Sequence, residues 1–364
     1  MSTASPHPQV PLRTVLSHVA VPIVMGLVMT LAYLGGFHHP SPHGVPVAVV
    51  GTPQQAGAIA ATIQGGVGER LDVQTVPTEA EAQTRLRELK ISGAFVPGPK
   101  RTLLVASASS DSTTSAVEKI FTTVAAAQGA PLAVRDVVPL DETDPIGQNG
   151  FFYLVTLSVG SYATAIAIAA AGATRRFRER LGLLIGAAVL TASAQLAFAS
   201  ILFGMFPGHG AAVWGLSVLY SLTVMAIGVG LHVVVGRFST LLFSAMFVAL
   251  NFTSSGGVFQ PAMQPGFFGW LNAFWIGSGF LRTLNHVLYF PDADATHGVS
   301  ILIGWLLFGG GCLALAHYVD FRRRHLARLA RTNESLRSLL DRARTDGLTP
   351  RQAMELELEE DVAV

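Results

Sequence analysis

Long apolar runs constrain the possible fold of this chain more than any other feature. A helix needs about 20 consecutive apolar residues to cross about 30 Å of hydrocarbon. Half of the 364 residues are hydrophobic and only 13% are charged, a balance outside the usual range of soluble globular proteins. We therefore expect an α-helical polytopic membrane protein with six transmembrane helices. The predicted spans are residues 15–36, 151–173, 181–204, 211–235, 238–257 and 298–318.

Clustered arginines predict the orientation of these spans. Arg175, Arg176, Arg178 and Arg180 lie in the short link after the second span, and Arg322 to Arg324 follow the last one. Short loops rich in Lys and Arg stay in the cytoplasm. We therefore expect a multi-pass plasma-membrane protein whose N-terminus (1–14) and tail (319–364) are both cytoplasmic. The first apolar run is longer than a signal-peptide core and no clear cleavage site follows it, which favours a permanent span over a cleavable signal peptide.

Residues 37–150, outside the membrane in this orientation, differ in character from the spans. Within them, short β-rich runs at 45–51, 71–76, 91–97 and 102–109 alternate with helical patterns at 54–64, 79–89 and 112–127. Ala82, Leu86 and Leu89 would share one face of the middle helix. The sequence predicts a small extracytoplasmic α/β domain between the first two spans. The single cysteine, Cys312, lies in the last span, so this domain must be stable without disulfides.

Signals for catalysis or metal binding are weak. His38, His39 and His43 lie together after the first span, and imidazoles can bind zinc, but no carboxylate or cysteine stands near them. We interpret them as part of a linker and expect no metal site. No paired carboxylates and no nucleophile with a base occur at membrane depth, so we expect no catalytic residues, no enzymatic activity and no cofactor in this chain.

The predicted spans contain no group suited to an ion relay. Asp, Glu, Lys and Arg are absent from the middle of every span, and Gln195, in the middle of the third span, is interpreted as forming an interhelical hydrogen bond. Energy for transport would then come from ATP. The chain has no GxxxxGK[ST] loop, so any ATPase must be a separate polypeptide.

The stretch TSSGGVFQPAMQP, residues 253–265, cannot continue a membrane helix. Irregular backbone at the bilayer is tolerated only where protein or water surrounds it. We interpret residues 258–290 as a re-entrant segment, with aromatic side chains at headgroup depth. We expect seven residues to line a substrate pathway or the contact with the α/β domain: Ser254, Ser255, Gly256, Gly257, Pro261, Pro265 and Arg282.

The same segment resembles a known family. The succession SSGGVF, PGFFGWL and GFLRTL resembles the end of the permease domain of ABC-2 type transporters, in particular the YhgE/Pip-like branch. The order of first span, α/β domain and remaining spans is also similar, so the resemblance covers residues 15–318. Two regions depart from the family pattern: VVGTP lacks the acidic residue often found there, and FWIGSGFLR lacks a proline.

The resemblance implies a bacterial plasma-membrane permease subunit that exports a hydrophobic or amphipathic substrate. Its partners would be membrane lipid, a second copy of itself and a separate ABC ATPase, with no nucleic acid. Arg175, Arg176, Arg178 and Arg180 are candidate ATPase contacts, although cytoplasmic retention alone accounts for them. The competing hypothesis is a non-transporting receptor or scaffold whose outer domain binds a secretion, cell-wall or phage partner.

The tail carries a short heptad pattern. Leucines at 326, 329, 336 and 340 and Asn333 repeat at spacings of three and four, as in a coiled coil. Self-association through this face and an amphipathic helix lying on the membrane both remain open. The chain ends in the acidic stretch ELELEED.

Overall fold

The computed structural model describes residues 11–127, 129, 131–172, 175–345, 349 and 351–352. The predicted acidic end of the tail, Ala173 of the second predicted span and most of the N-terminus (1–10) lie outside the described residues. The chain divides into two compact units, Met1–Cys312 and Leu313–Val364. The long helix α12 (Thr296–Thr345) begins in the first unit and continues into the second.

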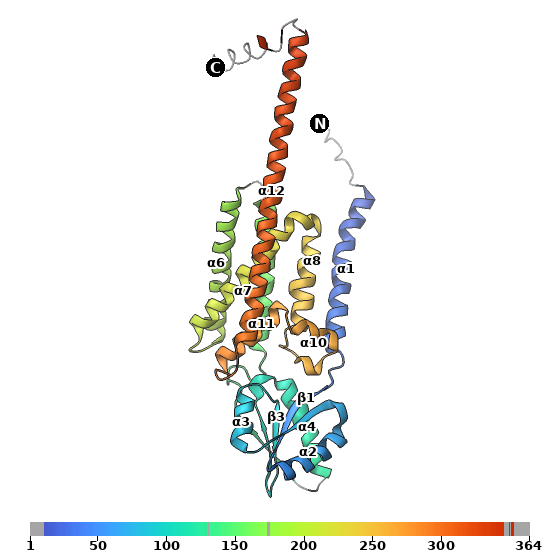
Figure 1. The fold of residues 1–364 in the computed structure, drawn as a ribbon, viewed down its shortest axis with the longest axis vertical. Helices are drawn as coiled ribbons and strands as arrows, with labels where there is room; N and C mark the ends of the chain where they lie inside the picture. The colour runs from blue at the N-terminus through green and yellow to red at the C-terminus, as the bar shows by residue number, and fades with distance from the viewer. Residues whose placement is uncertain are drawn as a thin grey trace, which may run out of the picture. The chain divides into compact units, whose positions relative to one another are not determined.

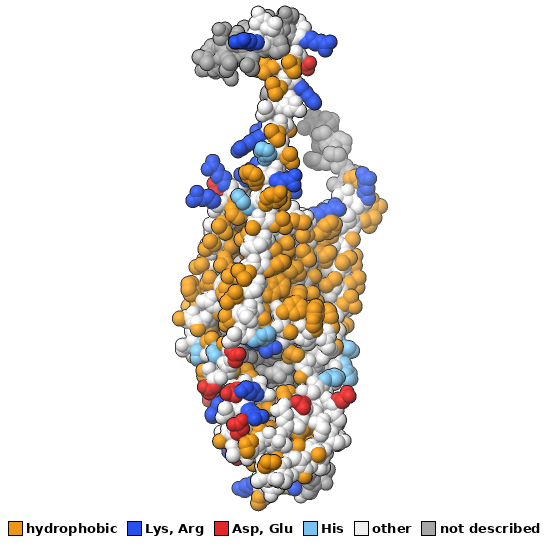
Figure 2. All heavy atoms as spheres, viewed as in Figure 1, with side chains coloured by type: hydrophobic (Ala, Val, Ile, Leu, Met, Phe, Trp, Pro, Cys, Tyr) orange, Lys and Arg blue, Asp and Glu red, His pale blue; other side chains and the backbone are white. Residues whose placement is uncertain are grey.

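Among the described residues, five helical runs are long and apolar enough to cross a membrane. They are α1 (Leu12–Phe37), α5 (Asn149–Ala171), α6 (Phe177–Phe203), the run Gly210–Ser254, and Thr296–Asp341 within α12. Large apolar side chains on α1 and α6 are exposed; Leu31 is 74% and Ile201 is 79% accessible. Figure 2 shows hydrophobic side chains covering the helices on one face of the molecule. These are the properties of a polytopic membrane protein.

The run Gly210–Ser254 is interrupted by a chain reversal. It comprises α7 (Gly210–Val235), a 3₁₀ turn (Gly236–Phe238), α8 (Ser239–Ser244), a π-helix (Ala245–Leu250) and α9 (Asn251–Ser254). Gly236 has a φ of 57°. A Cβ on Gly228 would lie 3.8 Å from Phe243 Cε2, whereas residues this far apart on a straight helix are separated by about 22 Å. The segment after Gly236 therefore folds back along α7 (Figure 1).

The fifth predicted span, residues 238–257, ends earlier than expected. Helix α9 stops at Ser254, and residues 255–260 form irregular chain. Beyond them come a 3₁₀ turn (Pro261–Met263), α10 (Gly266–Asn272) and α11 (Ile276–Leu288). The last two contain 7 and 13 residues, so they rise about 10 and 20 Å and are too short to cross the bilayer.

Residues 45–136, here called the sheet region, form a five-stranded sheet in the order β2-β1-β3-β4-β5. The strands are β1 (Val45–Val50), β2 (Leu71–Val76), β3 (Gly93–Val96), β4 (Arg101–Val105) and β5 (Leu132–Asp136). Strands β3 and β4 pair antiparallel, and all other neighbours are parallel. The helices that connect them are α2 (Pro53–Val67), α3 (Glu79–Arg87) and α4 (Asp111–Ala127).

Helices cover both faces of this sheet. Alternate residues of β1 point to opposite sides: Val47 and Val49 join the core beneath α2 and α4, and Ala48 joins the core beneath α3. Leu89 does not continue the face of Ala82 and Leu86 as predicted. The helix ends before it, and Leu89 is 43% exposed with a φ of 58°.

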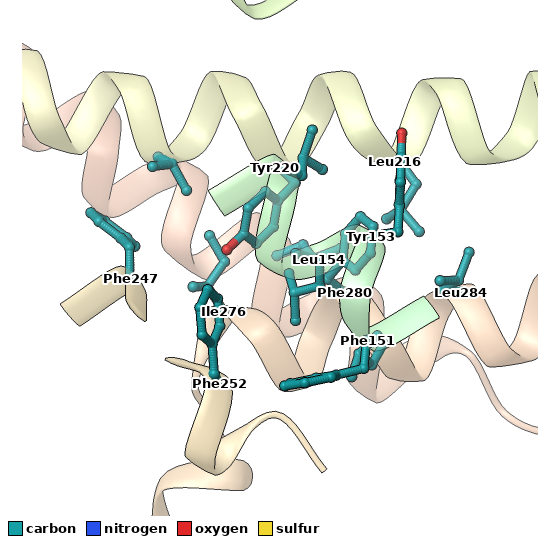
Figure 3. Close-up of a cluster of buried hydrophobic side chains, with 14 of the residues drawn as sticks. Phe151, Tyr153, Leu154, Leu216, Tyr220, Phe247, Phe252, Ile276, Phe280 and Leu284 are labelled. Atoms are coloured by element: carbon teal, nitrogen blue, oxygen red, sulfur yellow. The ribbon is translucent and has the colours of Figure 1, made fainter. Parts of the chain in front are cut away.

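The helices of the first unit share one aromatic core. Tyr220 of α7, Phe280 of α11 and Tyr153 of α5 are all buried, and Figure 3 shows them pointing toward one another. Tyr220 and Phe280 meet edge to face with ring centroids 5.1 Å apart. This core fixes the non-spanning helix α11 against α5 and α7 and so positions the site described next.

Candidate functional site

The helix-breaking stretch has an ordered start. Ser254 Oγ donates to the Leu250 carbonyl (2.7 Å) and Ser255 Oγ to the Phe252 carbonyl (3.0 Å), so both hydroxyls cap the end of α9. The Gly257 amide donates back to Ser255 Oγ (3.2 Å). Gly256 has a φ of 83°, a conformation that favours glycine. The chain therefore leaves the helix in a turn determined by these residues.

Gly257 sits where no side chain fits. A Cβ at this position would lie 2.5 Å from Phe151 Cδ2 and 2.8 Å from Leu281 Cδ1. Both neighbours are buried in the shared core. Gly257 thus allows the loop to pass between α5 and α11, and its role in the structure is close packing.

The following residues enter the sheet region. Met263 is 5% exposed and belongs to the core beneath α2 and α4, with Phe259 packed beside it. Ser112 Oγ donates to the Val258 carbonyl (3.0 Å), and Gln260 Nε2 donates to the Ser109 carbonyl (3.1 Å). The structure thus brings the loop into contact with the sheet region.

Each of the two prolines stands at the start of an element of this segment. Pro261 is the first residue of the 3₁₀ turn and Pro265 precedes α10, positions where the missing N–H is not required. Between them, Gln264 is 3% exposed, and its Nε2 donates to the Thr253 carbonyl (2.9 Å). The loop is therefore held at both ends.

A cavity of about 250 Å³ lies between the sheet region and the segment that follows α9, residues 255–289. Five of the seven predicted site residues line it: Ser255, Gly256, Gly257, Pro261 and Arg282. Ser254 and Pro265 are not part of its wall. The sheet region and the chain that follows it contribute a serine-rich turn, Ser107 to Ser110, and the carboxylates Asp111 and Asp144.

Arg282 is the cationic group of this cavity. Its side chain is exposed, and Nη2 donates to Asn272 Oδ1 at 2.5 Å. Asn272 is itself fixed, because its Nδ2 donates to the Ser254 carbonyl (2.8 Å) and it is 2% exposed. Within the described chain, no carboxylate forms an ion pair with Arg282. The guanidinium therefore retains donors for an anionic group.

Asp144 has a structural task on the cavity wall. Its Oδ1 accepts from the backbone N–H of Gln148 (2.9 Å) and of Asn149 (3.2 Å), at the start of α5. Burial raises the pKa of Asp144 above its ordinary value, and the backbone donors oppose this shift. Neither Asp144 nor Asp111 neutralises Arg282 through an ion pair.

A second polar cluster lies in the helical core, and sequence reasoning missed it. Asn251 is fully buried; its Nδ2 donates to the hydroxyl oxygen of Tyr220 (2.9 Å) and lies 3.3 Å from Ser158 Oγ. It follows directly after the π-helix, a feature often found at functional sites. The signal was available, because Asn251 is a strongly polar residue inside the predicted span 238–257.

Gln195 and the arginine cluster lie away from the cavity. Gln195 Nε2 donates to the Thr156 carbonyl at 3.2 Å, a hydrogen bond between α6 and α5. Arg175, Arg176 and Arg178 are exposed, but Arg180 is only 4% exposed. Arg180 therefore offers the least accessible surface of the four, and the interpretation of this cluster as an ATPase contact stays a prediction.

Two further expectations concern metal binding and self-association of the tail. Among the described residues no group of three or more His, Cys, Asp or Glu is placed to hold a metal ion. In the second unit, Leu326, Leu329, Leu336 and Leu340 are exposed on α12. Self-association through this face therefore stays a prediction.

Comparison with known proteins adds no further information. A scan against protein-family models and searches of curated proteins and of solved structures found no match to this chain.

Proposed function

We propose that this chain is the membrane-spanning permease subunit of an ABC-2 type exporter in a bacterial plasma membrane. It would pair with a second copy and with a separate ATPase, and it would move a hydrophobic or amphipathic substrate outward. The observation that carries the proposal is the segment from Ser255 to Leu288. It leaves the end of α9, contacts the sheet region, forms a cavity and returns through helices too short to span the bilayer.

The proposal includes six crossings. A straight helix of 45 residues would extend about 68 Å, more than twice the thickness of the hydrocarbon. The reversal at Gly236 instead divides the run Gly210–Ser254 into two segments packed side by side. The remaining apolar helices each supply one crossing, which leaves both termini in the cytoplasm when the arginine-rich links are placed inside.

Two exposed arginines at the start of α6, Arg176 directly before the helix and Arg178 in its first turn, are the proposed ATPase contacts. Arg176 and Arg178 are both accessible, unlike Arg180. The test is to purify the tagged, full-length chain from its native membranes in a mild detergent and to identify co-purifying proteins. A subunit with a nucleotide-binding loop is expected, and charge reversal at Arg176 and Arg178 should lower its recovery. Charge reversal at the exposed Arg87 of α3 is the matched control.

The sheet region supports the alternative of a non-transporting receptor or scaffold. Its serine-rich turn and the re-entrant segment form one concave surface that could hold a partner without any transport. Repeated purification without an ATPase, together with capture of a secretion, cell-wall or phage component, would favour this second candidate.

A further inference from the structure

An apolar groove lies near the cavity that Arg282 lines. The groove runs along α12 and has a volume of about 430 Å³. Its wall consists of Phe274, Ser300, Ile301, Gly304, Trp305 and Phe308. The side chains of this wall carry two polar groups, the Ser300 hydroxyl and the Trp305 N–H. The Trp305 N–H donates to the Phe274 carbonyl at 2.7 Å.

Arg282, on α11, packs against α12 close to the start of this groove. A Cβ on Gly298 would lie 3.1 Å from Arg282 Cβ, so α11 and α12 touch at this point. Ile301 follows three residues later, an axial rise of about 4.5 Å. It also contacts α11, because a Cβ on Gly279 would lie 2.8 Å from Ile301 Cγ2. The apolar groove thus begins about one helical turn from the residue that carries the cationic group.

We infer that Arg282 binds the anionic head group of an amphiphile whose hydrocarbon chain lies in the groove along α12. The guanidinium is oriented by the fixed Asn272 side chain and has no ion-pair partner among the described carboxylates. A phosphate or carboxylate head group supplies the missing charge. The aromatic walls of the groove, Phe274 and Phe308, are 39% and 49% exposed, and a hydrocarbon chain would cover them.

The inference deepens the proposed function, but only the role of the amphiphile as cargo rests on that function. Binding requires no ATPase and can be measured on the purified, full-length chain. A negative binding result would therefore leave the ATPase experiment intact, and a missing ATPase would leave the binding site intact.

The test measures dissociation constants by native mass spectrometry in a neutral detergent. The probes are short-chain phosphatidylglycerol, short-chain diacylglycerol, which has no charged head group, and inorganic phosphate. The anionic lipid should bind at least about tenfold more tightly than the uncharged one, as expected for one charge-assisted contact. Arg282→Gln should remove this preference, while Arg282→Lys should retain most of it because the charge remains.

Two glycine substitutions in α12 test whether lipid binding requires the open groove. A Cβ on Gly304 meets no atom within 4 Å, so Gly304→Leu should fill the groove without disturbing the backbone and should weaken lipid binding. Gly310 is equally unobstructed but does not line the groove, and Gly310→Leu is the matched control.

Three results would overturn the inference. The first is equal affinity for both lipids, and the second is an unchanged preference in Arg282→Gln. The third is wild-type lipid binding in Gly304→Leu combined with displacement of the lipid by inorganic phosphate. That combination would identify a site for small free anions instead of an amphiphile.

Discussion

Single residues decide how closely the loop approaches the helices, and Gly257 is the clearest case. The sequence flags it as a helix breaker, whereas the structure shows that its missing side chain matters more. Gly257→Leu should destabilise the protein by about 1–3 kcal/mol, the usual cost of overpacking, because Phe151 and Leu281 leave no space. Thermal unfolding in detergent measures this, with Gly310→Leu as control. Equal stability of the two variants would contradict the packing role.

Asp144 should make stability depend on pH. Because burial raises its pKa above 3.8, the folded chain binds this proton more tightly than the unfolded chain. The stabilisation from the protonated Asp144 carboxyl is fully present below pH 3.8, the ordinary pKa of the group. It is lost as the pH rises through the raised pKa of the folded state. Asp144→Asn should therefore gain thermal stability relative to the wild type as pH rises from acidic to neutral. A constant difference in melting temperature across this range would refute the assignment.

The sequence could predict part of the site at the scale of residues. Ser255, Gly256, Gly257 and Pro261 were recognisable because their types break helices, and all four line the cavity. Asn272 and Met263 were not recognisable. Asn272 acquires its role through tertiary contacts with Arg282 and the Ser254 carbonyl, and Met263 through burial in a core more than 120 residues away in sequence.

At the scale of elements, local patterns determined most of the sheet region. The strand predicted at 71–76 coincides with β2, because its β-rich composition is bounded by turns. Strand β5 was missed, since four of its five residues are exposed and show no apolar alternation. The reversal at Gly236 was expected only as a link between two apolar runs.

Replacement of two glycines tests that reversal. Gly236→Ala should destabilise the protein by about 1–2 kcal/mol, because its φ of 57° is unfavourable for any residue with a Cβ. Gly215→Ala is the contrasting variant: this exposed helical glycine has open space around it, and alanine should stabilise α7 by up to about 1 kcal/mol. Opposite shifts in melting temperature are expected. Shifts of the same sign would argue against a strained turn.

At the scale of the whole molecule, the number of crossings can be measured by cysteine labelling. In a Cys312→Ala background, single cysteines at Arg178, Arg237 and His209 can be exposed to a membrane-impermeant thiol reagent from either side. With six crossings, the first two should react from one face and the third from the other. Arg178 and Arg237 on opposite faces would rule out a crossing by each of α6 and α7, and with it the six-crossing topology.

The path of the loop also has a practical consequence for anyone who wants to study the sheet region in solution. A soluble fragment limited to residues 45–136 would lose the Met263 side chain from beneath α2 and α4, leaving a hole in its hydrophobic interior. Phe259 would be missing from the edge of the same core. Such a fragment should fold poorly unless residues 258–265 are grafted back or supplied as a peptide, much as a split protein is completed by its missing piece.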